Sequence, residues 1–278
     1  MFYKETNFKD TLIGKIPKEW EIVRLKEIAE VIMGQSPPSS TYNKEGVGLP
    51  FLQGKMEFGE IFPKPLVWCS EPIKVAEMND ILISVRAPVG DVNLAPYRLC
   101  IGRGLAAIRF NSERANYRFY FYYLQKIKKF LENLGKGSTF KAITKEDLED
   151  LKIVHAHLSE QHNIAEVLSV VDSAIELVDK IIWKTERLKK ALMQTLLTRG
   201  IGHKEFKETE IGKIPKAWQI VKLGEIAEMK RGFSYRSSDL CKYITSYRFL
   251  TINDYEKEGG LKISAEPIYL REDIEIDN

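Results

Sequence analysis

The chain has 278 residues, of which 44% are hydrophobic and 29% charged, and its 42 basic and 39 acidic residues give a net charge of +3. This profile is typical of a soluble globular protein with a sizeable core, and the near-balance of charge neither supports nor excludes nucleic-acid binding. Three widely spaced cysteines (Cys69, Cys100, Cys241), the absence of a signal peptide and the lack of an apolar run of roughly 18–20 residues exclude a disulfide framework and a membrane span and favour a cytoplasmic protein.

The first segment of the chain is repeated near its end. Residues 13–30 read IGKIPKEWEIVRLKEIAE and residues 211–228 read IGKIPKAWQIVKLGEIAE, with fourteen of eighteen positions identical at an offset of 198. The proline and the tryptophan of each copy suit a packed entry segment followed by a short helix. The repeat therefore predicts two similar modules on one chain and, through their pseudo-symmetry, two similar partners or half-sites.

The region between the repeats predicts a mixed fold. Short β-type runs at residues 81–85 and 105–110 are separated by glycine- and proline-rich turns. A helical pattern follows over residues 116–134, and its aromatic residues recur at helical spacing, so we expect them to form a core face more than a stacking platform for bases. The first half is thus expected to be α/β or α+β.

A single long helix is predicted over residues 159–198, where neither glycine nor proline occurs. Ser159 is the expected cap, and Gly200 and Gly202 are expected to end the helix. Its apolar positions follow a heptad pattern, which predicts a coiled coil. The positions expected to contact a partner helix are Ile164, Leu168, Val171, Ile175, Val178, Ile182, Leu188, Leu192 and Leu196.

The duplication indicates which helix would be the partner. An equivalent helix would come about 198 residues later, beyond Asn278, and the two would pair antiparallel. We therefore expect residues 1–158 to form a first domain, 159–200 a coiled-coil helix and 201–278 a second domain cut off partway. With its partner helix missing, the chain is expected to form a homodimer.

An ordered set of short motifs resembles the specificity subunit of type I restriction-modification systems. These motifs are IPKEWEIVRL, GQSPPS at residues 34–39, ILISVR at 81–86, GRG at 102–104, GSTFKAI at 137–143 and LSEQ at 158–161. The resemblance covers essentially the whole chain. It departs from the family pattern at residues 153–158, IVHAHL, where an apolar connector commonly contains proline, and this leaves the rigidity of the joint before the long helix open.

The resemblance implies a target-recognition domain, a long coiled-coil helix and the start of a repeated second target-recognition domain. Each domain would read one half of a bipartite site in double-stranded DNA, and the helices would set the spacing between halves. Methyl transfer and cleavage would belong to modification and restriction subunits. S-adenosylmethionine, ATP and Mg are accordingly expected only on those partners, and the chain itself is expected to be neither an enzyme nor a cofactor carrier.

Candidate DNA contacts lie in loops whose side chains suit bases or phosphates. Glutamine can read adenine, arginine reads guanine, and lysine, serine and threonine hold phosphates. Ordinary surface loops, solvated strand ends and a plain turn between helices are the alternatives. The candidates are Gln35, Ser36, Ser39 and Tyr42 in the first loop, Lys55, Arg86 and Arg103 near strand ends, and Lys136, Ser138, Thr139 and Lys141 in a later glycine-containing loop.

Two further readings are weaker. A self-contained adenine methyltransferase would need an Asn/Asp-Pro-Pro-aromatic motif, whereas the only Pro-Pro here stands between Ser36 and Ser39. A coiled-coil scaffold that binds protein without DNA specificity remains the alternative function. His155, His157 and His162 lack a cysteine or a spaced carboxylate to complete a metal site, so we expect them to be structural or exposed to solvent. The base sequence recognised does not follow from the residues.

Overall fold

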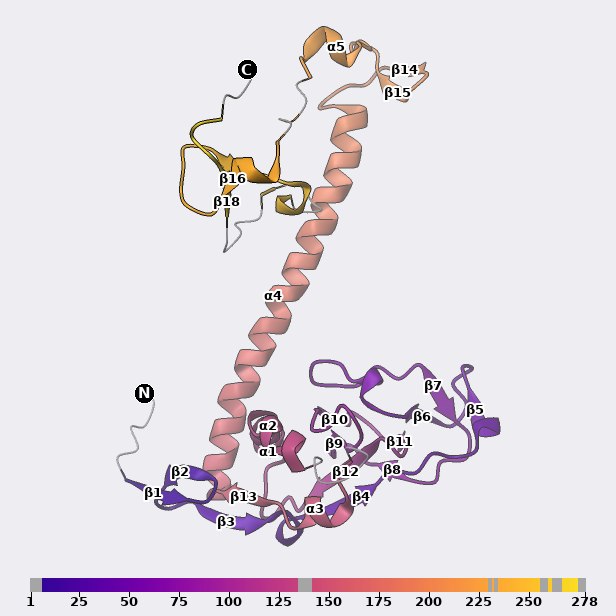
Figure 1. Cartoon of the computed structure of the whole chain (residues 1–278). Coiled ribbons are helices and arrows are strands. Elements are labelled where there is room, and N and C mark those ends of the chain that lie inside the picture. Colours follow the sequence, from indigo (N-terminus) through magenta and orange to yellow (C-terminus); the bar gives the residue numbers. More distant parts are fainter. Residues whose placement is uncertain are drawn as a thin grey trace. The chain divides into compact units, whose positions relative to one another are not determined.

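The structure is a computed structural model that describes residues 7–134, 142–229, 232, 235–255, 260–261 and 267–274 (Figure 1). The chain divides into two compact units, residues 1–188 and 189–278. The predicted loop residues Lys136, Ser138, Thr139 and Lys141 lie outside the described residues.

The first unit opens with a hairpin of β1 (Phe8–Thr11) and β2 (Gly14–Pro17). The next strand, β3 (Glu21–Arg24), pairs antiparallel with β13 (Lys152–His155), the last strand before the long helix. The β3–β13 pairing joins the entry and the exit of the domain, because the chain between these two strands forms its two larger sheets and its short helices.

A four-stranded antiparallel sheet forms the centre of the first unit, in the order β10-β9-β12-β4. Its strands are β4 (Ala29–Met33), β9 (Ile81–Ser84), β10 (Val92–Leu94) and β12 (Leu105–Phe110). The structure confirms strands in the two runs predicted from the sequence. Every residue of β9 is buried, which explains why its sequence is continuously apolar and does not alternate.

A second sheet of five strands has the order β5-β7-β6-β11-β8. The pair β6–β11 is parallel and the others are antiparallel. Buried residues from both sheets, including Leu52, Leu82, Leu99 and Leu105, form one cluster, so the sheets share a core. The strands are β5 (Tyr42–Asn43), β6 (Leu49–Leu52), β7 (Val67–Cys69), β8 (Val75–Ala76) and β11 (Leu99–Ile101).

Three short helices belong to the same unit: α1 (Tyr117–Lys126), α2 (Lys128–Leu134) and α3 (Lys145–Glu149). The single helix predicted over residues 116–134 is two helices, because Ile127 leaves helical geometry with φ −91° and ψ 12°. Phe119, Tyr120 and Phe121 are buried in the main cluster of the core. The prediction that the aromatic face of this segment forms core is therefore confirmed.

The long helix α4 (Leu158–Arg199) runs unbroken for 42 residues, roughly 60 Å at about 1.5 Å per residue. The prediction that Ser159 caps it is wrong, since the helix begins one residue earlier and places Ser159 in its first turn, with the hydroxyl 2.7 Å from His157 Nδ1. The predicted end is confirmed. Gly200 has φ +63°, a left-handed conformation that favours glycine, and its N–H donates to Leu196 O at 3.0 Å.

The second unit begins with the last turns of α4 and continues with the hairpin β14 (Phe206–Thr209) and β15 (Gly212–Pro215). Phe206 stands opposite Pro215, the register in which Phe8 stands opposite Pro17. The duplicated sequence thus forms the same hairpin twice. The remaining described elements are α5 (Leu223–Ile226) and a small sheet of β16 (Leu240–Cys241), β18 (Ile268–Leu270) and β17 (Arg248–Phe249).

Candidate nucleic-acid interface

Three glycine-containing segments of the first unit meet backbone to backbone, and we call this meeting point the glycine node. It consists of residues 34–36, 53–55 and 102–104. A Cβ on Gly34 would overlap with the carbonyl oxygen of Gly102, and one on Gly104 would lie 2.5 Å from Gln53 O. The segments are also hydrogen-bonded, because Gly104 N–H donates to Gln53 O at 3.2 Å. Only glycine permits backbones to approach this closely.

The glycine node brings together three exposed side chains that can read bases. Gln35, Gln53 and Arg103 are each exposed, and each belongs to a different segment of the node. Glutamine offers a donor and an acceptor to adenine, and arginine offers two parallel donors to guanine. Each segment follows directly on a strand (β4, β6 or β11), and residues 102–104 also lead directly into β12. A rigid platform with protruding amide and guanidinium groups is suited to reading base edges.

The other candidates of the first loop hold the loop together. Ser36 Oγ accepts a hydrogen bond from Arg103 N at 3.2 Å, which ties two segments of the glycine node. Tyr42 donates its hydroxyl to Pro37 O at 2.9 Å, and its ring stacks on Phe51 at 4.6 Å between centroids. Ser39 lies exposed in a short 3₁₀ turn of the same loop. DNA contact by these three residues stays a prediction.

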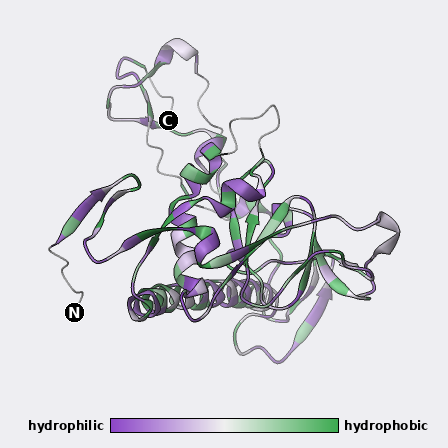
Figure 2. Ribbon diagram, turned by 90° about the horizontal axis from the view of Figure 1, so that it is seen from below, coloured by the Kyte–Doolittle hydropathy of each residue, from purple (hydrophilic) through white to green (hydrophobic). Residues whose placement is uncertain are grey.

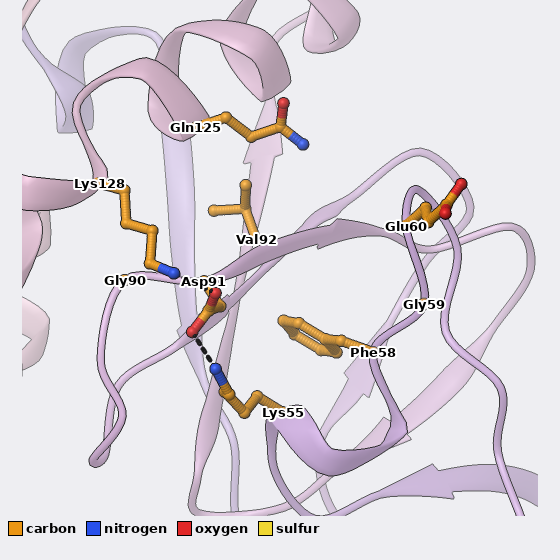
Figure 3. Close-up of a pocket in the computed structure, with 9 residues that line it drawn as sticks. All are labelled: Lys55, Phe58, Gly59, Glu60, Gly90, Asp91, Val92, Gln125 and Lys128. Carbon is orange, nitrogen blue, oxygen red and sulfur yellow. Dashed lines mark hydrogen bonds and ion pairs between the residues drawn. The ribbon is translucent and has the colours of Figure 1, made fainter. Parts of the chain in front are cut away.

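Lys55 is the last residue of the second segment of the glycine node, and its ammonium group is paired. Its Nζ lies 2.6 Å from Asp91, whose other carboxylate oxygen lies 2.6 Å from Lys128 Nζ, as the close-up in Figure 3 shows. The three groups line a polar cavity of about 300 Å³, together with Phe58 and Gln125. Burial raises the pKa of Asp91, but hydrogen bonds from Lys128 and Lys55 outweigh it and hold that pKa below its ordinary value.

Arg86 lies beside the glycine node, because the preceding residue, Val85, is hydrogen-bonded to it. Val85 N–H donates to Gly104 O at 2.9 Å, and Arg86 itself forms an isolated antiparallel bridge with Ala142. Its side chain is exposed. Five predicted residues that are spread along the sequence therefore lie in one region of the structure: Gln35, Ser36, Lys55, Arg86 and Arg103. Their contact with DNA stays a prediction.

Two residues of this region were missed by sequence reasoning. Gln53 looks like an ordinary polar residue before a glycine, and Asp91 looks like an acidic residue after a turn. The Gln-Gly pair beside a buried strand end was the available signal for Gln53. No local pattern pointed to Asp91, because the two lysines that pair with it come from a distant 3₁₀ turn and from α2.

A second surface of interest is the α4 stripe, which we define as Leu168, Val171, Ile175, Val178, Ile182, Leu188, Leu192 and Leu196. Leu168 is 37% exposed, and Leu188 reaches 58%. Figure 2 shows hydrophobic and hydrophilic residues side by side along the helix. At the base of the helix, Ala165 is buried in the main core cluster and Ile164 packs against it. An apolar surface of this length favours association with another helix.

The α4 stripe continues into an apolar cavity of about 710 Å³ at the base of the helix. Trp20 of the entry segment and Phe119 and Tyr123 of α1 line one side of it, and Ile164 and Leu168 of α4 line the other. The exposed apolar surface is therefore continuous from the first turns of α4 to the entry segment of the domain.

The three histidines near α4 contact protein atoms. His155 Nδ1 lies 2.8 Å from the Tyr120 hydroxyl, and His162 Nδ1 lies 2.8 Å from Leu158 O. Across the described residues, no group of three or more potential metal ligands comes together. Nor does that part of the chain contain a helix with the length and apolarity to cross a membrane.

A comparison with known protein families identifies the family to which the glycine node and α4 belong. The profile described as "Type I restriction modification DNA specificity domain" matches residues 17–187, which include the whole glycine node and most of α4. The chain belongs to this specificity-domain family. The match begins at the entry segment and ends within the long helix, so the first unit is the part that the family describes.

Individual relatives in the specificity-domain family point the same way. One is a protein of Methanocaldococcus jannaschii with the provisional name type I restriction enzyme MjaX specificity subunit, 54% identical over 72% of this chain and 47% of its own length. The MjaVIII specificity subunit of the same organism is 29% identical over 87% of this chain and 57% of its own. The chain thus spans about half the length of the curated relatives it matches.

A solved structure gives the same picture of the fold. The HsdS subunit from Thermoanaerobacter tengcongensis matches with a TM-score of 0.53 and 41% identity, covering 68% of this chain and 47% of that one. The fold of a recognition domain followed by a long helix is therefore that of the specificity-domain family.

Proposed function

We propose that this chain is a sequence-specific DNA recognition subunit of a type I restriction-modification complex. The observation that carries the proposal is the glycine node, which holds Gln35, Gln53 and Arg103 exposed on a fixed backbone inside the segment matched by the family profile. Direct reading of base edges requires such groups to be positioned before DNA arrives. The names of the relatives, specificity subunits of type I restriction enzymes, support this role.

We further propose that recognition is bipartite. Each recognition domain reads one half of the site, and α4 sets the distance between the halves. The repeated hairpin β14–β15, with its register equal to that of β1–β2, supports a second recognition domain starting near Phe206. The stretches that match this chain make up 47% and 57% of two of those specificity subunits, which fits two such domains in each of them.

The chemistry of the complex lies on other subunits in this proposal. The chain recruits modification and restriction subunits, and S-adenosylmethionine, ATP and Mg bind there. This division follows the naming of the relatives as specificity subunits. The role of this chain is then to supply the DNA sequence and the geometry at which the partners act.

A homodimer completes the recognition unit in this proposal. Two copies pair antiparallel through the α4 stripe, so that two recognition domains stand at opposite ends of a helical pair. The exposed apolar residues from Leu168 to Leu196 support it, since a coiled-coil heptad is stable in water only when its apolar seam is covered.

The test is selection of DNA by the chain from a random duplex pool, with and without its modification subunit, followed by sequencing of the retained duplexes. Enrichment of a short fixed motif, or of two inverted copies around a spacer, is the expected result. No enrichment even with the modification subunit present would instead favour a coiled-coil scaffold without DNA specificity.

A further inference from the structure

The joint between the recognition domain and α4 contains no proline, yet a fully buried amide crosses it. Gln161, in the first turn of α4, has no exposed surface. Its Oε1 accepts the N–H of Asn116 at 2.8 Å, and its Nε2 donates to Ala156 O at 2.8 Å and to Arg114 O at 3.4 Å. Both donor hydrogens and the acceptor of the amide are therefore used by backbone groups on two other segments.

The hydrogen bond to Asn116 couples two helix starts. Asn116 is the N-cap of α1, and its side chain accepts the N–H groups of Arg118 and Phe119. Gln161 takes the backbone N–H of that same cap residue. The first turn of α4 is consequently fixed to the first turn of α1 by an amide whose geometry tolerates little rotation, because hydrogen bonds weaken steeply off axis.

A second set of contacts holds α4 further along its axis. The hydroxyl of Tyr122, on α1, donates to Asp172 Oδ2 at 2.6 Å, and its oxygen lies 3.3 Å from Ser169 Oγ. The residues Gln161 and Asp172 are separated by roughly 16 Å along the helix, at about 1.5 Å per residue. A single contact would act as a pivot, whereas two contacts separated along an axis fix the direction of that axis.

Direction matters because α4 is long. A tilt of about 10° at the base moves the far end of a roughly 60 Å helix by about 10 Å, which is about three base pairs at roughly 3.4 Å each. Apolar packing of Ile164 and Ala165 against the core stabilises the joint but does not by itself specify an angle, since such contacts are non-directional. Buried polar groups supply that geometric specificity.

We propose that Gln161 and the Tyr122–Asp172 pair are positioning residues that set the direction of α4 relative to the recognition domain and, through it, the spacer length between the two half-sites. The inference rests on the proposed bipartite function. It assigns spacing to named side chains at the base of the helix, in addition to the length of the helix itself.

The first test measures direction without DNA. Spin labels at Glu113→Cys, on the recognition domain, and Asp179→Cys, on α4, report one distance within the first unit; Cys241→Ser removes the cysteine that is not buried. Excess unlabelled chain confines the signal to pairs within one molecule. We expect a narrow distribution in the wild type and a clearly broader one in Gln161→Leu and in Tyr122→Phe. Gln194→Leu, the same change at an exposed position of α4, is the matched control and should leave the width unchanged.

Equal widths in all four chains would overturn the proposal. Gln161→Leu removes the hydrogen-bond partner of three backbone groups and can lower stability. Tyr122→Phe removes only a hydroxyl, so it keeps the test valid if the first variant does not fold.

The second test measures spacing on DNA with the selected motif, placed as inverted pairs around spacers of different length. We expect the wild type to prefer one spacer by about tenfold over spacers two base pairs longer or shorter, and the variants to lose most of that preference while retaining the same half-site motif. A motif lost from the wild type contradicts the proposed function. If every chain selects the same motif and the variants prefer one spacer as strongly as the wild type does, the positioning role of these residues is wrong. The proposed DNA-recognition function is then unaffected.

Discussion

At the scale of single residues, glycine decides where the polar side chains of the candidate interface stand. Gly34, Gly102 and Gly104 carry no base-reading group, but their missing Cβ atoms let three loops touch. Gln35, Gln53 and Arg103 then project from one platform. A Cβ at Gly34 or Gly104 would overlap backbone atoms of a neighbouring segment, so a side chain there would force these segments apart.

Arg103 is the residue at which base reading is most directly testable. We expect Arg103→Ala to weaken binding of the selected motif by about 1–3 kcal/mol and to relax the preference at one base position, since a bidentate contact to guanine would be lost. Motif selection and titration at fixed salt measure both effects. Arg98→Ala is the matched control, an exposed arginine paired with Glu77 at 3.2 Å, and it should leave the motif unchanged. An unchanged motif in Arg103→Ala would remove this residue from the readers.

Because the carboxylate of Asp91 is paired with two lysines, we expect the free energy of unfolding to depend on pH. The pKa of this carboxyl is raised by burial but lowered more by Lys128 and Lys55, so its net shift is downward. A lowered folded-state pKa stabilises the fold above the ordinary carboxyl pKa, and this contribution is lost as pH falls through the lower folded value. Asp91→Asn should therefore cost about 1–2 kcal/mol at pH 7, with allowance for the partial exposure of the carboxylate.

Urea unfolding of Asp91→Asn and wild type at pH 7, 5 and 3.5 measures this dependence. The difference between the two chains should be constant from pH 7 to about 5 and shrink below about 4, where the wild-type carboxyl becomes neutral. A difference that stays the same at every pH would mean that the ion pairs contribute nothing to it.

At the scale of elements, the sequence of α4 predicts a partner helix, whereas most of its apolar face is exposed in the single chain. Its local signals specify a helix with an apolar heptad seam, but the seam from Val171 onward is exposed in the single chain. Hydrophobic side chains in this arrangement gain free energy by pairing, and a second helix with the same heptad fits the seam.

Charge placed in the α4 stripe should abolish self-association. We expect Ile175→Asp together with Ile182→Asp to reduce the molecular mass in solution at micromolar concentration from that of a dimer to that of a monomer. Light scattering measures the mass, and circular dichroism checks that the first domain stays folded. Lys180→Asp with Lys184→Asp introduces the same side chains at polar positions and should leave the dimer intact. A wild-type chain that is monomeric, or a double variant of unchanged mass, would contradict pairing through the stripe.

At the scale of the whole molecule, the duplicated segment has two different environments. Leu25 and Ile28 are buried at 0% and 1% exposure, whereas their repeats Leu223 and Ile226 are 64% and 70% exposed. In the first unit, β3 pairs with β13 and Leu25 N–H donates to Leu151 O. The described residues of the second unit offer no such pairing to residues 219–222.

Amide hydrogen exchange should distinguish the two copies. Peptides covering residues 22–28 should be protected at least about 100-fold more than peptides covering residues 220–226, because exchange follows local hydrogen bonding and packing and not sequence. The hairpins β1–β2 and β14–β15, whose registers are equal, serve as the internal comparison and should differ far less. Equal protection of both segments would mean that the second copy is packed in solution as the first is.

Much of the architecture follows from local patterns. The heptad and the flanking Gly200 predicted α4 to within a residue at each end, and the apolar runs predicted β9 and β12. These signals lie within a few turns or one strand, so no distant residue is needed to interpret them. The same holds for the aromatic face of α1, whose spacing indicated burial.

The candidate site could be predicted from the sequence only in part. Gln35 and Arg103 could be chosen by residue type, but their proximity depends on three backbone segments that are distant in the chain. Gln53 was missed for that reason, and Lys55 was expected to be available although Asp91 binds it. The anchoring of α4 by Gln161 was equally hidden, because its partners are backbone groups that carry no sequence signature.

The sequence by itself determined the duplication, the long helix with its apolar seam and the family to which these belong, because each depends on periodicity or on the order of local motifs. Only the tertiary structure decided which polar groups meet at the glycine node, how α4 is held at its base and which copy of the repeated segment is buried. Those outcomes depend on contacts between residues far apart in the chain. Two nearly identical segments with opposite burial show that local sequence specifies conformation, while burial requires a partner.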